Sequence, residues 1–111
     1  MTTEKKWQTI CHKTDLVKNS GVCALLENEE QIAIFQVNNE AVYSVGNWDP
    51  IGEANVLYRG LIGDRKGDIY VASPLYKQRF VLNSGKCLDD ESVSIKTYDT
   101  RIENEQVQVL A

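Results

Sequence analysis

Short runs of apolar residues alternate with clusters of turn-forming residues along the whole chain. An apolar residue at every second position turns one face of a strand toward a core, so these runs predict β-strands. We expect strands over residues 7–11, 22–26, 31–37, 41–45, 68–72, 79–82, 92–97 and 106–109. The first is a candidate edge strand, and the last two alternate most regularly. Residues 46–67 show no clear period and are predicted to be irregular.

The run at 31–37 differs from the others because its apolar side chains fall on both faces. These side chains are Ile32, Ala33, Ile34, Phe35 and Val37. Such a pattern is typical of a strand covered from both sides, so we expect this one to be central in its sheet. Residues 37–41 include two asparagines, which tolerate left-handed backbone angles, and they predict a hairpin turn into the next strand.

The chain shows no helix signal of useful length. No stretch of ten or more residues combines a 3.6-residue apolar period with end caps. Short strands and frequent turns then indicate an all-β fold, a small antiparallel β-sandwich or barrel. The 111 residues suffice for one core, and neither a repeat nor a linker divides them. We therefore expect residues 1–111 to form a single domain.

Composition and charge exclude several classes of function. The chain has 12 Lys and Arg against 16 Asp and Glu, a net charge of −4, and its basic residues are scattered. A surface that follows phosphates needs clustered Lys and Arg, so nucleic acid is not an expected partner. No apolar run approaches the roughly 18 residues of a membrane span. No export signal opens the sequence, so we expect a cytoplasmic protein that does not enter a membrane.

The cysteine and histidine content limits the metal sites that the chain could build. Its cysteines are Cys11, Cys23 and Cys87, and its one histidine is His12. A Rieske cluster needs two Cys and two His ligands, and an ordinary ferredoxin cluster needs four thiolates. A zinc site of three thiolates and one imidazole is possible by number, but no Cys-x-x-Cys pair supports it. We favour three buried thiols in a reducing compartment.

Two loops contain the prolines of the chain, at residues 47–52 and 72–80. Proline fixes its own backbone angle and extends the residue before it, so these loops hold their side chains in set directions. The loops resemble those of Rieske proteins, which carry Cys-x-His in a first loop and Cys-Pro-x-His in a second. Residues 49–51 (Asp-Pro-Ile) fall on the first motif and residues 73–76 (Ser-Pro-Leu-Tyr) on the second. Residues 41–45 match the strand that leads into the first loop.

In this resemblance every cluster ligand is replaced. Asp49 and Ser73 stand at the cysteine positions, and Ile51 and Tyr76 stand at the histidine positions. Isoleucine has no lone pair, and tyrosine is a poor replacement for a neutral imidazole. The resemblance therefore implies a Rieske-like scaffold with no cluster, metal or other cofactor on this chain. Asp49 and Ser73 would instead accept hydrogen bonds from backbone N–H groups of their own loops.

Within the Rieske-like group, the sequence resembles the small subunits of cytoplasmic NAD(P)H-dependent nitrite reductases. The resemblance covers nearly the whole chain and is most specific at residues 57–62 and 71–80. It implies a small antiparallel β-sandwich base with a two-loop subdomain inserted over residues 47–79. It also implies an accessory role in the reduction of nitrite to ammonium. The chain would dock on a large subunit that carries FAD, an iron–sulfur cluster and sirohaem.

The residues expected to meet that partner are Trp48, Ile51, Leu75 and Tyr76. Tyr and Trp combine a large apolar area with a polar tip and are enriched at interface cores. A second interpretation is that Trp48 and Tyr76 fill the space left by the missing cluster. Two other functions stay open: a free-standing Rieske-like binding or regulatory module, and a [2Fe–2S] electron-transfer protein. The ligand count argues against the latter, and no catalytic set of the chain's own is apparent.

Overall fold

The computed structural model describes residues 5–38 and 41–111, and nearly all of their regular structure is β. Two single-turn 3₁₀ helices, η1 (Lys13–Asp15) and η2 (Leu57–Arg59), are the only helical segments among these residues. The strands are β1 (Trp7–His12), β2 (Ser20–Leu25), β3 (Gln31–Val37), β4 (Ala41–Gly46), β5 (Trp48–Asp49), β6 (Ala54–Asn55), β7 (Leu61–Arg65), β8 (Asp68–Ala72), β9 (Arg79–Val81), β10 (Thr97–Glu103) and β11 (Gln106–Leu110). The all-β class that the sequence predicts is confirmed.

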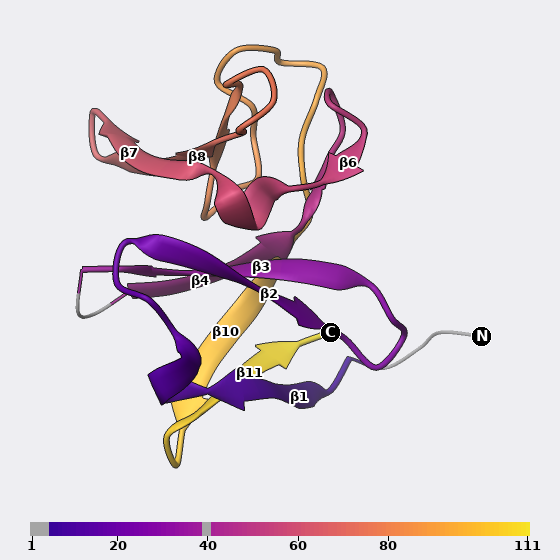
Figure 1. Cartoon of the computed structure of the whole chain (residues 1–111), viewed down its shortest axis with the longest axis vertical. Coiled ribbons are helices and arrows are strands. Elements are labelled where there is room, and N and C mark those ends of the chain that lie inside the picture. The colour runs from indigo at the N-terminus through magenta and orange to yellow at the C-terminus, as the bar shows by residue number, and fades with distance from the viewer. Residues whose placement is uncertain (1–4, 39–40) are drawn as a thin grey trace.

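The strands form three antiparallel sheets, which divide the fold into a base and an insert (Figure 1). The base, residues 5–46 and 97–111, holds a six-stranded sheet in the order β1-β11-β10-β4-β3-β2. The insert, residues 47–96, carries the β5–β6 hairpin and the three-stranded sheet β7-β8-β9. As predicted, β1 is an edge strand. No helix among the described residues has the length and apolar character needed to cross a membrane.

The base sheet is bent so that its two halves enclose a core. Ile32 and Ile34 of β3 pack with Val107 and Val109 of β11, although β4 and β10 separate these strands in the sheet. The two sheet edges also meet, because the N–H of Glu27, just after β2, donates to the Gln8 side chain of β1 over 2.9 Å. The predicted sandwich-like base is therefore present.

The opposite face of β3 forms one wall of a second core, which joins the base to the insert. Ala33 and Phe35 are fully buried there and pack with Leu57, Val71 and Phe80 of the insert. The prediction that residues 31–37 are covered on both faces is confirmed. β3 is an interior strand of its sheet, with β4 on one side and the edge strand β2 on the other.

The structure corrects the sequence predictions at three places in the insert. Residues 92–97 are not a strand: β10 begins at Thr97, and Ser94 makes only an isolated bridge to Lys86. Residues 46–67 are not irregular, because β5, β6, η2 and β7 lie there. The insert does not end at Arg79, since β9 pairs with β8 and the chain returns to the base only after Lys96.

The predicted turn at 37–41 is confirmed as the hairpin between β3 and β4. Val37 pairs with Ala41, and Asn38 has a positive φ of 56°, a conformation that asparagine tolerates. Asn39 and Glu40, the other two residues of the predicted turn, lie outside the described residues. The register of β3 against β4, in which Phe35 pairs with Tyr43, centres the hairpin on the predicted turn.

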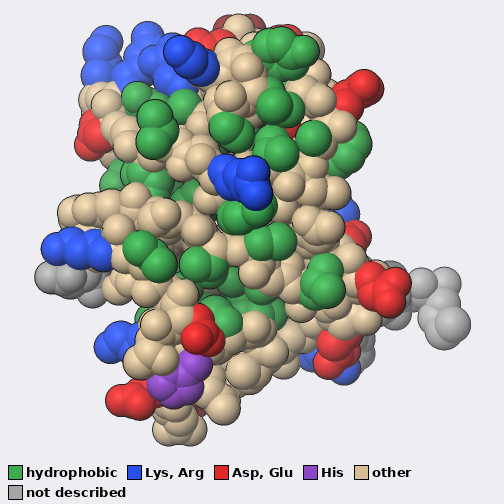
Figure 2. Space-filling view, viewed as in Figure 1, with side chains coloured by type: hydrophobic (Ala, Val, Ile, Leu, Met, Phe, Trp, Pro, Cys, Tyr) green, Lys and Arg blue, Asp and Glu red, His purple; other side chains and the backbone are tan. Residues whose placement is uncertain are grey.

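The net charge of the chain lies outside the insert. Residues 47–96 contain seven Lys and Arg and seven Asp and Glu, so the remaining five basic and nine acidic residues give the whole −4. Figure 2 shows apolar side chains gathered on the β5–β6 side of the insert, with most charged groups toward the margins of this face. An end of the molecule with no net charge and a partly apolar surface is suited to protein contact.

Candidate functional site

The two proline loops have the same backbone design. In the first, the Glu53 N–H donates to the Asp49 carbonyl over 2.7 Å, and in the second the Lys77 N–H donates to the Ser73 carbonyl over 3.0 Å. Glu53 and Lys77 both have positive φ angles, of 55° and 62°. Each loop therefore makes one tight turn that begins at the residue before its proline.

The side chains of Asp49 and Ser73 hold these turns together. Asp49 Oδ1 accepts hydrogen bonds from the N–H groups of Ile51 and Gly52, at 2.8 Å and 3.0 Å. Ser73 Oγ accepts one from the Leu75 N–H at 3.3 Å. The predicted bonds from both side chains to backbone donors are confirmed.

Sequence reasoning missed that the two loops are also joined to each other. Ser73 donates its hydroxyl proton to Asp49 Oδ2, and both side chains are buried, with exposed fractions of 1% and 0%. The loops pack closely, because a Cβ atom on Gly52 would lie 2.9 Å from Asp49 Oδ2 and would also meet Leu75. The two positions where the family resemblance places cysteines thus form a polar link between the loops.

Asn47 is a second structural residue that the sequence did not single out. It is fully buried at the start of the insert, and its amide Nδ2 donates to Gln31 Oε1 at 3.2 Å and to the Asn55 carbonyl at 3.1 Å. Its Oδ1 accepts from the Tyr58 N–H at 2.8 Å. One side chain therefore joins β3 of the base to β6 and η2 of the insert. Its only sequence signal is an Asn just after a buried strand.

The predicted interface residues are mostly exposed. Trp48 has an exposed fraction of 49%, Leu75 of 45% and Tyr76 of 65%. The interpretation that Trp48 and Tyr76 fill an internal space is therefore wrong. Ile51 differs from these three, because it is partly buried against the core of the insert. The loop end is thus a surface of three large side chains on a hydrogen-bonded frame.

The residues at this site do not fit a [2Fe–2S] cluster. Asp49 and Ser73 are committed to each other and to backbone donors, and Ile51 offers no lone pair. Among the described residues, no three His, Cys, Asp or Glu side chains gather where they could hold a metal ion.

The expectation of three buried thiols is only partly correct. Cys87 is buried, whereas Cys11 is half-buried and Cys23 is exposed.

An ion pair closes the far side of the second loop. Arg79, the first residue of β9, places its Nη2 atom 2.8 Å from Asp89 Oδ1. The backbone N–H of Arg79 also donates to Asp89 Oδ2 over 2.8 Å. These bonds from Arg79 lower the pKa of Asp89. The strand that follows the second loop is therefore fixed to the long return segment of the insert.

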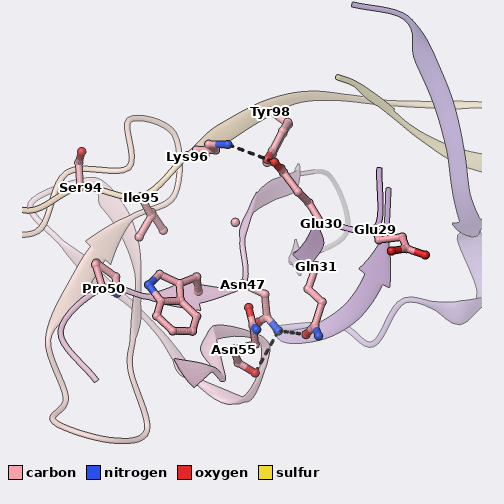
Figure 3. Close-up of a pocket in the computed structure, with 12 residues that line it drawn as sticks. Glu29, Glu30, Gln31, Asn47, Pro50, Asn55, Ser94, Ile95, Lys96 and Tyr98 are labelled. Carbon is pink, nitrogen blue, oxygen red and sulfur yellow. Dashed lines mark hydrogen bonds and ion pairs between the residues drawn. The ribbon is translucent and has the colours of Figure 1, made fainter. Parts of the chain in front are cut away.

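A pocket of about 410 Å³ lies beside the first loop, between base and insert (Figure 3). Pro50 and Ile95 lie on one side of it, and Glu30, Lys96 and Tyr98 on another. The Tyr98 hydroxyl donates to Glu30 Oε2 over 3.0 Å, and Lys96 Nζ is 3.4 Å from Glu30 Oε1. The hydrogen bond from Tyr98, and after it the contact with Lys96, lower the pKa of Glu30. Partial burial and the neighbouring Glu30 carboxylate raise the pKa of Tyr98 to about 12.

The six-stranded base, the inserted small sheets and the paired proline loops define a Rieske-like domain. The family of Rieske-like [2Fe–2S] domains matches residues 6–110. The nitrite reductase (NADH) small subunit of Salmonella typhimurium is 47% identical over 105 residues, which are 94% of this chain and 96% of that protein. The chain belongs to the family of nitrite reductase small subunits.

Two further comparisons extend this result. The solved structure of the Escherichia coli protein NirD superposes with a TM-score of 0.87 at 44% identity, covering 96% of this chain and 97% of that one. The nitrite reductase [NAD(P)H] large subunit of Klebsiella oxytoca is 40% identical over 105 residues, which are 95% of this chain but only 11% of that protein. A module of this family is thus part of a large subunit in that organism.

Proposed function

We propose that this chain is the accessory small subunit of an NAD(P)H-dependent nitrite reductase and that it docks on the catalytic large subunit. The observation that carries the proposal is the near full-length similarity to small subunits of that name, at 45–47% identity. The reaction would be the six-electron reduction of nitrite to ammonium in the cytoplasm. The chain itself would supply a binding surface and no reacting group.

The Klebsiella relative supports the choice of partner. In that protein a module similar to this chain occupies 11% of a large subunit, so the two parts act within one polypeptide. Covalent joining raises the effective concentration of one part around the other. A separate small subunit has to reach the same arrangement by its own affinity, which requires a docking surface.

We assign all cofactors of the reaction to the large subunit, namely FAD, an iron–sulfur cluster and sirohaem. The loop chemistry supports this assignment, because the positions that carry cluster ligands in Rieske proteins hold Asp49, Ile51, Ser73 and Tyr76 here. An electron-transfer role through a cluster on this chain would need thiolate and imidazole ligands at these positions. A protein–protein role needs only the exposed side chains around them.

We place the docking surface on the loop end, at Trp48, Leu75 and Tyr76, with Ile51 adding the exposed part of its side chain. Three properties support this choice. The side chains are large and exposed, the insert that carries them has no net charge, and buried hydrogen bonds hold the loops in place. A preordered surface loses little conformational entropy on binding, so more of the contact energy appears as affinity.

Reconstitution tests the proposed function. The purified large subunit of the same organism is assayed for NAD(P)H-dependent nitrite reduction, alone and with increasing amounts of this chain. We expect the chain to bind the large subunit and to raise its activity to a plateau at a fixed ratio. No binding and no change in activity would refute the accessory role. Binding without any effect on nitrite reduction would favour a regulatory module.

The loop-end surface has its own test. Trp48→Ala and Tyr76→Ala are each expected to raise the Kd for the large subunit by about fivefold or more, the level of a contributing interface residue at about 1 kcal/mol. Gln108→Ala on β11 is the control and should leave the Kd unchanged. Circular dichroism first confirms that each variant is folded. A folded double variant with wild-type affinity would move the interface elsewhere.

A further inference from the structure

The pocket beside Trp48 lies where base and insert meet. The chain leaves the base through Gly46 and Asn47 and returns through residues 94–96, and all of these residues line the pocket. Its volume of about 410 Å³ is within the range of small-molecule and side-chain binding sites, roughly 300–1,000 Å³. Trp48 and Pro50 belong both to this pocket and to the first loop, so the pocket continues the loop-end surface around its side.

The walls of the pocket combine an aromatic face with negative charge. Trp48, only half-buried, lines the cavity, Glu30 supplies a carboxylate to it and Lys96 the one ammonium, while the Glu29 carboxylate lies at its outer margin (Figure 3). Lys96 is paired with Glu30 at 3.4 Å, whereas Glu29 forms no ion pair with any described residue. One negative charge therefore remains, in a molecule whose net charge of −4 lies entirely outside the insert. Aromatic rings and carboxylates are the groups that attract a cation.

The position of the chain ends indicates that the large subunit lies near this pocket. The Lys6 and Ala111 backbones exchange two hydrogen bonds of 3.1 Å, so the ends of β1 and β11 are adjacent. A second hollow, lined by Lys5 and Ala111, shares Glu30, Lys96 and Tyr98 with the pocket. In the Klebsiella relative the polypeptide continues from such a module into the large subunit. That polypeptide therefore leaves the module beside the second hollow, which adjoins the pocket.

We propose that this pocket receives an arginine side chain of the nitrite reductase large subunit, stacked on the indole of Trp48 and paired with the carboxylate of Glu30. The inference deepens the proposed function and rests on it. A planar guanidinium can lie on an indole face and pair with a carboxylate at its edge, which a compact ammonium does less well. Arginine is also enriched at the centres of protein interfaces.

Lys96 would compete with the arginine, because its ammonium pairs with the same Glu30 carboxylate. Its side chain is mostly exposed and its contact with Glu30 is long, so it can move aside at small cost. It competes with the incoming cation, both by pairing with Glu30 and by like-charge repulsion. Removing the charge of Lys96 should therefore strengthen binding, an effect opposite to that of most interface substitutions.

Binding measurements with the whole large subunit test the proposal. We expect Glu30→Gln to raise the Kd about tenfold, equivalent to ~1.4 kcal/mol, and Lys96→Gln to lower it severalfold. The amide oxygen introduced by Glu30→Gln can still accept the Tyr98 hydrogen bond, so the fold is retained. The matched control is Glu27→Gln, which removes the same charge from the same segment but lies outside the pocket and pairs with Lys6 at 2.8 Å. It should leave the Kd unchanged.

The outcomes separate this proposal from the proposed function. Wild-type affinity in Glu30→Gln and Lys96→Gln, together with weakened binding by Tyr76→Ala, would overturn the pocket proposal and leave the docking function standing. Weaker binding by Lys96→Gln would also overturn it, because Lys96 would then pair with an acidic group of the partner. If the wild-type chain does not bind the large subunit, both proposals fail.

Discussion

Replacing Asp49 with alanine should destabilise the fold far more than an exposed loop substitution. The side chain is fully buried and accepts three hydrogen bonds, from the N–H groups of Ile51 and Gly52 and from the hydroxyl of Ser73. A net loss of about 1 kcal/mol for each bond gives about 3 kcal/mol in total. At roughly 4 °C per kcal/mol for a domain of this size, the melting temperature should fall by about 12 °C.

Two further variants show whether the loss comes from these bonds. Asp49→Asn keeps Oδ1 for the two backbone donors and can donate its amide to Ser73 Oγ, so it should cost only about 1 kcal/mol. Ser73→Ala removes the link between the loops and the bond to the Leu75 N–H, and should cost about 2 kcal/mol. Urea unfolding monitored by circular dichroism gives the free energies by linear extrapolation.

The order of the three variants in stability shows whether these hydrogen bonds hold the loops. The bond count predicts that Asp49→Ala is the most damaging, Ser73→Ala is intermediate and Asp49→Asn is mildest. An Asp49→Ala protein within about 1 kcal/mol of wild type would mean that water replaces the lost acceptor, which the burial of the side chain argues against. An Asp49→Asn protein as unstable as Asp49→Ala would show that charge, and not hydrogen-bond geometry, holds the loops.

Three other changes test neighbouring parts of the site. Gly52→Ala places a Cβ against the second loop and should cost about 1–3 kcal/mol in urea unfolding by overpacking, whereas unchanged stability would mean that Leu75 moves freely aside. Asn47→Ala leaves the Tyr58 N–H without its acceptor and should cost about 2 kcal/mol by the same assay; Asn47→Asp should be no milder, because it keeps Oδ1 but loses both amide donors and buries a charge. Arg79 lowers the pKa of Asp89, so this carboxylate adds stability above its unfolded pKa of about 3.9 and loses it as pH falls through the lower folded value. Melting curves should therefore show wild type more stable than Asp89→Asn at neutral pH, with the difference shrinking below about pH 4; a constant difference would contradict the pairing.

The pattern of apolar and polar residues was enough to predict those strands whose burial follows from neighbouring residues in the sequence. The five apolar residues at 31–37 predict burial on both faces, and β3 has two cores against it because each face of a strand takes alternate residues. The same reasoning failed at 92–97, where Ile95 is buried but its N–H donates to the Gly85 carbonyl instead of to a neighbouring strand. Alternation there reflects side-chain burial without strand pairing.

The candidate site shows the same limit. The turns within each loop follow from short-range chemistry, because Asp49 and Ser73 each bind N–H groups two or three residues further on. The bond between Asp49 and Ser73 joins residues 24 apart in sequence, and only the folded insert brings them together. The exposure of Trp48 and Tyr76 is likewise set by how the loops pack, so the sequence left two interpretations of these residues open.

The shared use of β3 has a consequence for how the molecule unfolds. Ile34 faces the core of the base and Phe35 faces the core of the insert, so neither core can open without exposing the same strand to water. The base and the insert should therefore melt in a single cooperative transition, and the amide hydrogens of β3 should exchange with solvent only through global unfolding. A cavity made on either side, by Ile34→Val or by Phe35→Leu, would then lower the stability of both halves together.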